Sequence, residues 1–355
     1  MNNMMNMNLL LKTAFKRKRV LITGHTGFKG SWLALWLSKL GAEVFGYSLP
    51  PPTTPSHYSC ARIHELLSGE VIADIRDRSA LTSTIDNFNP HLIFHMAAQA
   101  LVRPGYAHPI DTFDTNIMGS ANILEVVRQS GAPRIVIMIT SDKCYEQEAV
   151  SHPFFEGDRL GGDDPYSASK AAAEIVINAY RLSYFQPEKI IKHKVKIASV
   201  RAGNVIGGGD FATDRIIPDI VRSLSDNLPI WIRNPPSIRP WQHVLEPLSG
   251  YMLLGAKMMK TDDPALCSSW NFGPLEDQSL PVSELVNMFI SRWNTGSWVD
   301  VSDLNAPHEA PCLRLSIRKA QENLGWEPRW DIRTTVEKTV DWYKEYLELP
   351  DSSMQ

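Results

Sequence analysis

Four residues in two short runs have side chains that could move protons and expel water. Asp142 and Lys143 lie where a strand is expected to end, and Tyr166 and Lys170 form a Tyr-x-x-x-Lys pair downstream. At this spacing the lysine lies one helical turn from the tyrosine, where its charge is expected to lower the pKa of the phenol. The pair alone can move a proton during hydride transfer. With an added acid and base beside it, the same site could also eliminate water.

A glycine-rich loop near the start of the chain predicts a dinucleotide site. An apolar run at 20–23 is typical of a buried parallel strand, and an amphipathic segment follows at 31–40. The spacing between them is G-x-x-G-x-x-G, whereas the usual fingerprint is G-x-G-x-x-G, so a tight turn without a ligand is the alternative. Backbone N–H groups and the helix dipole at such a turn can hold a pyrophosphate. The residues expected to contact the cofactor here are Gly24, His25, Thr26, Gly27, Phe28, Lys29 and Gly30.

Strand-like and helix-like segments continue to alternate after this loop. The expected strands lie at residues 43–48, 71–73, 91–95, 134–139 and 196–200. This order predicts an α/β fold, a Rossmann-like doubly wound parallel sheet with a smaller C-terminal substrate-binding lobe. Ligands on such sheets bind beyond the carboxyl ends of the strands. Asp74, Ala97, Ala98 and the run from Ser141 all lie at such ends, so they are expected to converge on one edge.

The domain boundaries follow from changes in composition. We expect a loosely ordered extension at residues 1–16, with an oligomer contact as the alternative. Residues 17–200 should form the dinucleotide-binding domain. Beyond residue 200 proline, tryptophan and arginine become more frequent, so 201–350 are expected to form mainly the substrate-binding lobe, interleaved with the first domain.

Composition excludes several classes of protein. The net charge of −3 gives no field for nucleic acid, and no apolar stretch is long enough to cross a membrane. Four cysteines without a C-x-x-C pair argue against a disulfide framework and a zinc site, so no metal is expected. The first apolar run precedes the basic residues, the reverse of a secretory signal. We therefore expect a cytoplasmic enzyme with reduced thiols.

A proline-rich segment at 232–244 carries groups suited to a nucleotide. Arg233 and Arg239 match the oxygens of a phosphate, because a guanidinium fork binds them bidentately. Trp241 could stack on a base or sugar. The alternative is a surface turn with a structural tryptophan.

Taken together, these motifs resemble a known family. The glycine loop, the Ala97-Ala-Gln99 run and the Tyr166 and Lys170 pair are similar to the extended short-chain dehydrogenase/reductase superfamily of nucleotide-sugar enzymes. Longer runs at 24–32, 140–145, 201–210 and 238–250 resemble the CDP-glucose 4,6-dehydratases in particular. The likeness extends from about Lys18 to Tyr346, nearly the whole chain.

The resemblance implies a role for each catalytic candidate. Tyr166 would remove the proton of the sugar C4 hydroxyl as hydride passes to NAD, Ser141 would hydrogen-bond the C4 oxygen, and Lys170 would also hold the nicotinamide ribose. Asp142 would protonate the leaving C6 oxygen. Lys143 would remove the C5 proton, in place of the glutamate of thymidine-linked relatives. These last two roles require a raised pKa for the acid and a lowered one for the lysine, whereas an ion pair between them would shift both the other way.

The resemblance also implies the cofactor and the substrate contacts. No acid or arginine follows the second strand at Gly46-Tyr-Ser48, so NAD rather than NADP rests on likeness. Asp74 and Ile75 suit the adenine, and His25 would face the ribose or solvent. Further contacts implied for the cofactor are Ala97, Ala98 and Gln99; those for the sugar nucleotide are Gln99, Arg103, Asn204, Arg239 and His308.

The implied reaction converts CDP-glucose to CDP-4-keto-6-deoxyglucose and water, by a homodimer or homotetramer working in deoxysugar and O-antigen biosynthesis. A 4-epimerase would share the glycine loop and the Tyr166 and Lys170 pair but would not need Asp142 and Lys143. A dehydratase acting on another nucleotide-linked glucose, or a non-catalytic dinucleotide sensor, are the remaining alternatives.

Overall fold

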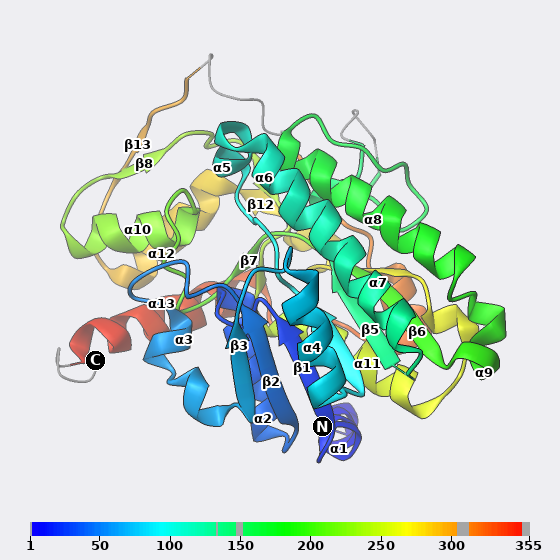
Figure 1. Cartoon of the computed structure of the whole chain (residues 1–355). Helices are drawn as coiled ribbons and strands as arrows, with labels where there is room; N and C mark the ends of the chain where they lie inside the picture. The colour runs from blue at the N-terminus through cyan, green and yellow to red at the C-terminus, as the bar shows by residue number, and fades with distance from the viewer. Residues whose placement is uncertain (1, 133, 147–151, 304–311, 350–355) are drawn as a thin grey trace.

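A seven-stranded parallel sheet forms the centre of the molecule (Figure 1). The structure is a computed structural model that describes residues 2–132, 134–146, 152–303 and 312–349. The strand order is β11-β6-β5-β4-β1-β2-β3. The chain adds β2 and β3 on one side of β1 and then β4, β5, β6 and β11 on the other, so the sheet is doubly wound. The strands are β1 Arg19–Thr23, β2 Glu43–Ser48, β3 Gly69–Ile72, β4 Leu92–His95, β5 Arg134–Ile139, β6 Val195–Ala202 and β11 Ser269–Phe272. The Rossmann-like fold class predicted from the alternation is confirmed.

Helices cover both faces of this sheet, so its strands are apolar on both sides. Val20 and Ile22 point into one core, where α2 (Phe28–Lys39) and α11 (Leu245–Lys260) pack. Leu21, between them, points into the other, beneath α4 (Arg78–Phe88), α7 (Gly119–Ser130) and α8 (Pro165–Ser183). This alternation buries every second residue on the same face. It fixes the register of the strand ends that carry the candidate site residues.

A third core lies outside the sheet, in the part of the chain after residue 200. It gathers α10 (Ile216–Ser225), α12 (Val282–Trp293) and α13 (Ile332–Glu348) around the parallel pair β8 (Ile230–Ile232) and β13 (Trp298–Asp300). The remaining short elements are α3 His57–Cys60, α5 Val102–Ala107, α6 Pro109–Phe113, α9 Ile190–His193, β7 Val205–Ile206, β9 Ile238–Arg239, β10 Gln242–His243 and β12 Leu280–Pro281. Since β11 returns to the main sheet, the two parts are threaded through one another. The domain boundary at residue 200 stays a prediction.

The amino terminus differs from the expected loose extension. Residues Asn2–Phe15 form α1, which packs against α11. Leu11 and Phe15 are 1% and 0% exposed and belong to the core of the sheet face that α2 and α11 cover. The polar Asn residues at its start concealed this pattern, because the two anchoring side chains lie four apart at the end of the segment. Burial of two large apolar groups holds the helix on the domain.

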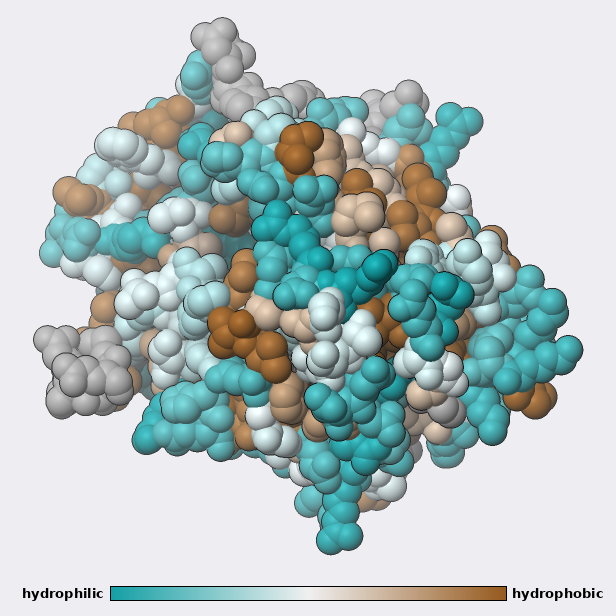
Figure 2. All heavy atoms as spheres, viewed as in Figure 1, coloured by the Kyte–Doolittle hydropathy of each residue, from teal (hydrophilic) through white to brown (hydrophobic). Residues whose placement is uncertain are grey.

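The surface is mostly hydrophilic, with apolar patches on the face of Figure 2. Exposed apolar side chains include Ile110 on α6, Met118 just before α7, and Ile175 on α8. Within the described residues, no helix is both long and apolar enough to cross a membrane.

Candidate active site

The glycine loop between β1 and α2 needs its small residues for close backbone approaches. Gly24 has a φ of +77°, and a Cβ there would lie 2.7 Å from the backbone nitrogen of Ala97. A Cβ on Gly30 would lie 2.1 Å from the carbonyl oxygen of Gly24. The helix α2 starts at Phe28 with Gly27 as its N-cap and no side-chain cap, so its first N–H groups remain available to an anion. This cradle fits the diphosphate of a dinucleotide.

His25 in this loop is turned into the protein. Its side chain is fully buried, and its Nε2 lies 2.7 Å from a carboxylate oxygen of Glu70. A Cβ on Gly46 would lie 2.5 Å from the imidazole ring, which explains why β2 carries a glycine where many relatives of the fold carry an acid. Burial lowers the pKa of His25 although Glu70 raises it. Of the two expected orientations of His25, toward the ribose or toward solvent, the second is wrong because the ring is buried against Gly46, and the first stays a prediction.

The other cofactor candidates lie at the same sheet edge, where they bond to protein groups through side chains or backbone. Thr26 hydrogen-bonds Ser48 and the carbonyl of Leu49, so it braces the loop. The backbone nitrogen of Ala97 donates to the Thr23 hydroxyl at 3.2 Å, which places the Ala97 and Ala98 run beside Gly24.

Two further cofactor candidates, Asp74 and Ile75, follow β3. The Asp74 carboxylate accepts hydrogen bonds from the Arg76 side chain, and these bonds hold the pKa of Asp74 below its usual range. Ile75 is buried against Gly119, where a Cβ would lie 2.8 Å from it. These placements put all the candidates near one sheet edge, and their contacts with a cofactor stay predictions.

Tyr166 and Lys170 come from the first turns of α8. Asp164 caps this helix by accepting bonds from the backbone nitrogens of Tyr166 and Ser167, and Pro165 fills its first position. The side chain of Ser141 hydrogen-bonds Tyr166. Both tyrosine and lysine are buried, at 8% and 6% exposure. The capped helix therefore fixes the pair against the loop that follows β5.

That loop is the 3-10 helix η3 (Asp142–Cys144), which begins directly after Ser141. The Ser141 hydroxyl donates to Asp142 Oδ1 at 3.0 Å and accepts from the Lys143 backbone nitrogen at 3.2 Å. Asp142 Oδ2 is buried and has no partner among the described residues. An unpaired buried carboxylate oxygen is costly unless a ligand uses it. The structure thus brings Ser141, Asp142 and Tyr166 together around one unsatisfied acceptor.

The pKa of Tyr166 differs from the expectation. We expected Lys170 to lower it, but burial raises the pKa of Tyr166 to about 12, and the groups that oppose this shift are the Ser141 hydrogen bond and the charge of Arg215. Burial also lowers the pKa of Lys170 to about 8. The expected direction is wrong because removing the phenol from water outweighs the nearby cations. The lysine pKa still lies above neutral, so the cation is present at pH 7.

Two basic residues reach this site that sequence reasoning did not single out for their side chains. Lys29 Nζ donates to the Tyr251 hydroxyl at 3.4 Å, and its pKa is lowered to about 7 by burial and then by the charges of Lys170 and Arg215. Arg215, at the start of α10, pairs with Asp210 at 2.9 Å. A lysine inside a glycine loop was a visible signal for the first. Nothing in the local sequence marked the second, which the chain brings in from the other lobe.

The expected substrate contacts are divided between buried and exposed positions. Asn204 carries a buried Oδ1 without a partner among the described residues, as a ligand contact would require. The Gln99 amide is already engaged by the Leu101 carbonyl and the Thr112 hydroxyl. Arg103 bonds Asp214 at 3.3 Å on the surface. The roles of these residues stay predictions.

The proline-rich segment resolves one alternative. Trp241 is 3% exposed and donates its indole N–H to the Leu280 carbonyl, so it is a structural tryptophan, and it lies in the core rather than in a surface turn. Arg239 is buried and donates to the Ile238 carbonyl. Arg233 bonds Asp214 at the surface. His308 lies outside the described residues.

A doubly wound parallel sheet with a glycine cradle and a Tyr-x-x-x-Lys pair at its carboxyl edge defines the short-chain dehydrogenase/reductase class. Within it, the chain belongs to the GDP-mannose 4,6 dehydratase family, whose model matches residues 21–339. It is 48% identical to the CDP-glucose 4,6-dehydratase of Salmonella typhimurium over 96% of this chain and 94% of that protein. It is 26% identical to the UDP-glucuronate 4-epimerase of Thermodesulfobacterium geofontis over 93% of this chain and 97% of that protein.

Solved structures of both 4,6-dehydratases and 4-epimerases have a fold similar to that of this chain. A dTDP-glucose 4,6-dehydratase from Streptomyces venezuelae, solved with NAD, has a TM-score of 0.79 at 23% identity, covering 94% of this chain and 99% of that one. A UDP-glucose 4-epimerase from Thermotoga maritima has a TM-score of 0.78 at 20% identity, covering 93% and 100%. The fold therefore does not separate dehydratase from epimerase.

Proposed function

We propose that this protein is an NAD-dependent CDP-glucose 4,6-dehydratase, a hydro-lyase that makes CDP-4-keto-6-deoxyglucose and water. The observation that carries this is the pair Asp142 and Lys143 directly after β5, in a segment that packs against α8 and follows Ser141, which hydrogen-bonds Tyr166. A 4-epimerase needs only the oxidation and return of a hydride at one carbon, so it has no use for a leaving-group acid and a C5 base. The 48% identity to a CDP-glucose 4,6-dehydratase supports the same reaction and the cytidine nucleotide.

NAD fits the glycine cradle described above. Gly24, Gly27 and Gly30 would let the backbone approach its diphosphate, and the free N–H groups of α2 would hold the charge. Lys170 would bind the nicotinamide ribose, and Asp74 and Ile75 would lie near the adenine. When bound, NAD accepts the C4 hydride and returns it to C6, so the overall reaction involves no net oxidation.

The chain's own groups would then carry the protons. Tyr166 would remove the C4 hydroxyl proton in its phenolate form, which a pKa of about 12 makes the less populated form at neutral pH, with Ser141 donating to the C4 oxygen. The resulting ketone acidifies the C5 proton, which Lys143 would take. Asp142 would protonate the C6 oxygen as water leaves, and its unpartnered Oδ2 is the atom suited to that contact. Lys143 would return a proton to C5, and net transfer of the proton held by Tyr166 to Asp142 would restore both groups for the next turnover.

The substrate would be held across both lobes. We propose Asn204 near the diphosphate, Arg239 and His308 at the phosphate and nucleotide, and Gln99 and Arg103 near the hexose. Support for Asn204 is its buried unpartnered oxygen. We further propose a cytoplasmic homodimer or homotetramer, for which the exposed apolar side chains on α6 and α8 offer a contact surface.

The test is incubation of the protein with NAD and CDP-glucose deuterated at C4, with product identification by mass spectrometry and NMR. Expected is a 4-keto-6-deoxy sugar with the label at C6. CDP-galactose as the only product would establish the epimerase instead. A parallel panel of UDP-, dTDP- and GDP-glucose tests the base preference, since a dehydratase for another nucleotide would turn over one of those faster.

A further inference from the structure

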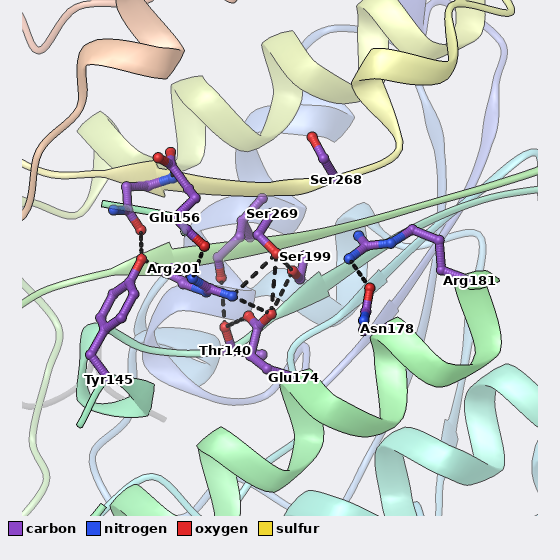
Figure 3. A network of polar contacts seen from close by, with 12 residues as sticks. Thr140, Tyr145, Glu156, Glu174, Asn178, Arg181, Ser199, Arg201, Ser268 and Ser269 are labelled. Carbon is purple, nitrogen blue, oxygen red and sulfur yellow. Dashed lines mark hydrogen bonds and ion pairs between the residues drawn. The ribbon is translucent and has the colours of Figure 1, made fainter. Parts of the chain in front are cut away.

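The catalytic loop after β5 is held at both ends by one buried ion pair. Thr140, just before Ser141, donates its hydroxyl to Glu174 Oε1 at 2.5 Å. Tyr145, just after Cys144, accepts a bond from Arg201 Nη1 at its hydroxyl, at 2.9 Å. Glu174 and Arg201 pair with each other at 2.8 Å (Figure 3). The segment that carries Asp142 and Lys143 is therefore closed into a loop by side chains outside the reacting centre.

Both carboxylate oxygens of Glu174 accept hydrogen bonds from protein groups. Its oxygens accept from the Thr140 and Ser199 hydroxyls and from Arg201, with Ser269 at 3.4 Å. Its side chain is 1% exposed and that of Arg201 is 3% exposed. Burial raises the pKa of the Glu174 carboxyl, but the charge and hydrogen bond of Arg201 outweigh this, so the net shift is downward. The pair is thus ionised at neutral pH, and its burial keeps both side chains away from solvent.

Glu174 also ties this loop to the helix that carries the hydride-transfer residues. Tyr166, Lys170 and Glu174 follow at intervals of four on α8, so they share one helix face. Because both residues belong to one helix, any shift of Glu174 along the axis of α8 would move Tyr166 as well. The ion pair therefore sets the position of Asp142 relative to Tyr166.

The other end of the pair reaches a third segment. The Tyr145 hydroxyl donates to Asn271 Oδ1 at 2.7 Å, and Asn271 Nδ2 donates to the Phe154 carbonyl at 3.0 Å. The rings of Tyr145 and Phe154 stack with centroids 4.9 Å apart. This end is held by aromatic packing as well as by the hydroxyl, so removal of the hydroxyl alone leaves the ring in place.

Resting on the proposed function, we infer that Glu174 and Arg201 are positioning residues that clamp the ends of the 141–144 loop, and that the clamp serves water elimination more than hydride transfer. Hydride transfer depends on Tyr166, whose backbone stays capped by Asp164 at the start of α8 when only Thr140 or Tyr145 is changed, although Ser141 of the loop also hydrogen-bonds its phenol. Elimination depends on Asp142 and Lys143, which lie between the two clamped ends. Loosening either end should therefore separate the two half-reactions.

The experiment compares Thr140→Val, which keeps the shape and removes the hydroxyl, with Thr140→Ser, which keeps the hydroxyl. Tyr145→Phe removes the hydrogen bonds from the hydroxyl to Arg201 and Asn271 at the other end and keeps the stacked ring. Hydride transfer is measured as the single-turnover rise in absorbance of the reduced cofactor, and elimination as product formation and C5 exchange with solvent deuterium. We expect Thr140→Val and Tyr145→Phe to slow elimination by about tenfold to a hundredfold and hydride transfer by less than about threefold. Thr140→Ser should restore near-wild-type elimination.

A readout without substrate tests the clamp itself. Amide hydrogen exchange of the 140–145 segment should quicken by about tenfold in Thr140→Val and Tyr145→Phe. The matched control is Glu246→Gln, another buried carboxylate, which accepts hydrogen bonds from the backbone nitrogens of Arg329 and Trp330 and, in the described part of the chain, bonds no member of this network. It should lower the melting temperature without changing exchange in the 140–145 segment.

The possible failures are distinguishable. If wild-type protein does not form the 4-keto product, the proposed function fails, while the exchange comparison still decides whether the loop is clamped. If both half-reactions slow equally, or if Glu246→Gln loosens the 140–145 segment as much as Thr140→Val does, the pair is a general structural element and the inference is overturned.

Discussion

Two buried polar clusters meet at α8, and their charges are arranged in opposite ways. In the clamp, Glu174 and Arg201 face each other at 2.8 Å, and hydroxyl groups satisfy the remaining carboxylate oxygen. In the catalytic cluster, the half-buried Lys29 lies near the like charge of Lys170, and Asp142 keeps an oxygen without a partner among the described residues.

The two clusters shift the pKa of their groups differently. The net pKa shift of Glu174 favours its charged form, whereas the shifts of Lys29, Lys170 and Tyr166 all favour the neutral forms. The first arrangement stabilises a fold, and the second leaves groups ready to exchange protons with a substrate. Removal of Glu174 should therefore cost stability as well as the positioning of the 141–144 loop, whereas removal of the Tyr166 phenol should change the rate alone.

The largest effect should follow from Tyr166→Phe. Loss of the phenol removes the group that takes the C4 proton, so hydride transfer should fall by about 10³-fold or more. Stability should hardly change, since the phenol loses one hydrogen bond, to Ser141, and the Ser141 hydroxyl keeps its bonds with Asp142 and the Lys143 backbone nitrogen. Stopped-flow absorbance of the reduced cofactor and a thermal melt check both halves. Normal hydride transfer in this variant would remove Tyr166 from the base role.

Glu174→Ala should show the reverse, a large loss of stability. It leaves the Arg201 guanidinium buried without its counter-ion, which costs about 3–5 kcal/mol of unfolding free energy. Urea titration followed by tryptophan fluorescence measures this. A loss of less than about 1 kcal/mol would mean that the interior accommodates the free cation with water, and the contrast between the two clusters would fail.

The sequence predicted this fold well because its signals are local. The apolar run at 20–23 and the glycines after it mark a strand followed by a tight turn, and the parallel sheet followed from the alternation of strand-like and helix-like segments after them. The sequence also named Ser141, Asp142 and Tyr166, which lie together.

What the sequence missed depends on distances between remote segments. Arg215 reaches the site from the other lobe, and the pKa of Tyr166 rises because the folded protein removes its phenol from water. The imidazole of His25 turned inward because Glu70, 45 positions away, offers it an acceptor. Leu11 and Phe15 likewise gained their role only from a helix near residue 250.

Lys29→Met should sharpen the comparison by stabilising the catalytic cluster. The pKa of Lys29 is lowered from its ordinary value of 10.5 to about 7, so its burial costs stability while it is protonated. The free energy of unfolding carries no penalty from Lys29 above about pH 10.5, and the penalty grows as pH falls toward 7, because the unfolded chain binds the proton more readily. We expect the methionine variant to be more stable at pH 6 by ~1–2 kcal/mol, a discounted value because Lys29 is only half-buried, with the advantage vanishing by about pH 10. Melting temperatures across this range test the slope, and a pH-independent gain would point to packing instead.

The smallest effect should come from Glu125→Gln, which isolates burial as the cause of the contrast. Arg128 holds Glu125 with bonds of 2.8 and 2.7 Å, as short as the bond between Arg201 and Glu174, but this pair lies on the surface. Arg128 lowers the pKa of Glu125 to about 2, so any contribution is present above its ordinary pKa of 4.5 and is lost as pH falls toward 2.

Solvent screens such a pair, and Gln can keep one of the bonds. The melting temperature at pH 7 should therefore change by less than about 1 °C, and any difference should disappear in 1 M salt. A loss comparable to that of Glu174→Ala would show that bond geometry, rather than exclusion of water, makes the buried pair strong.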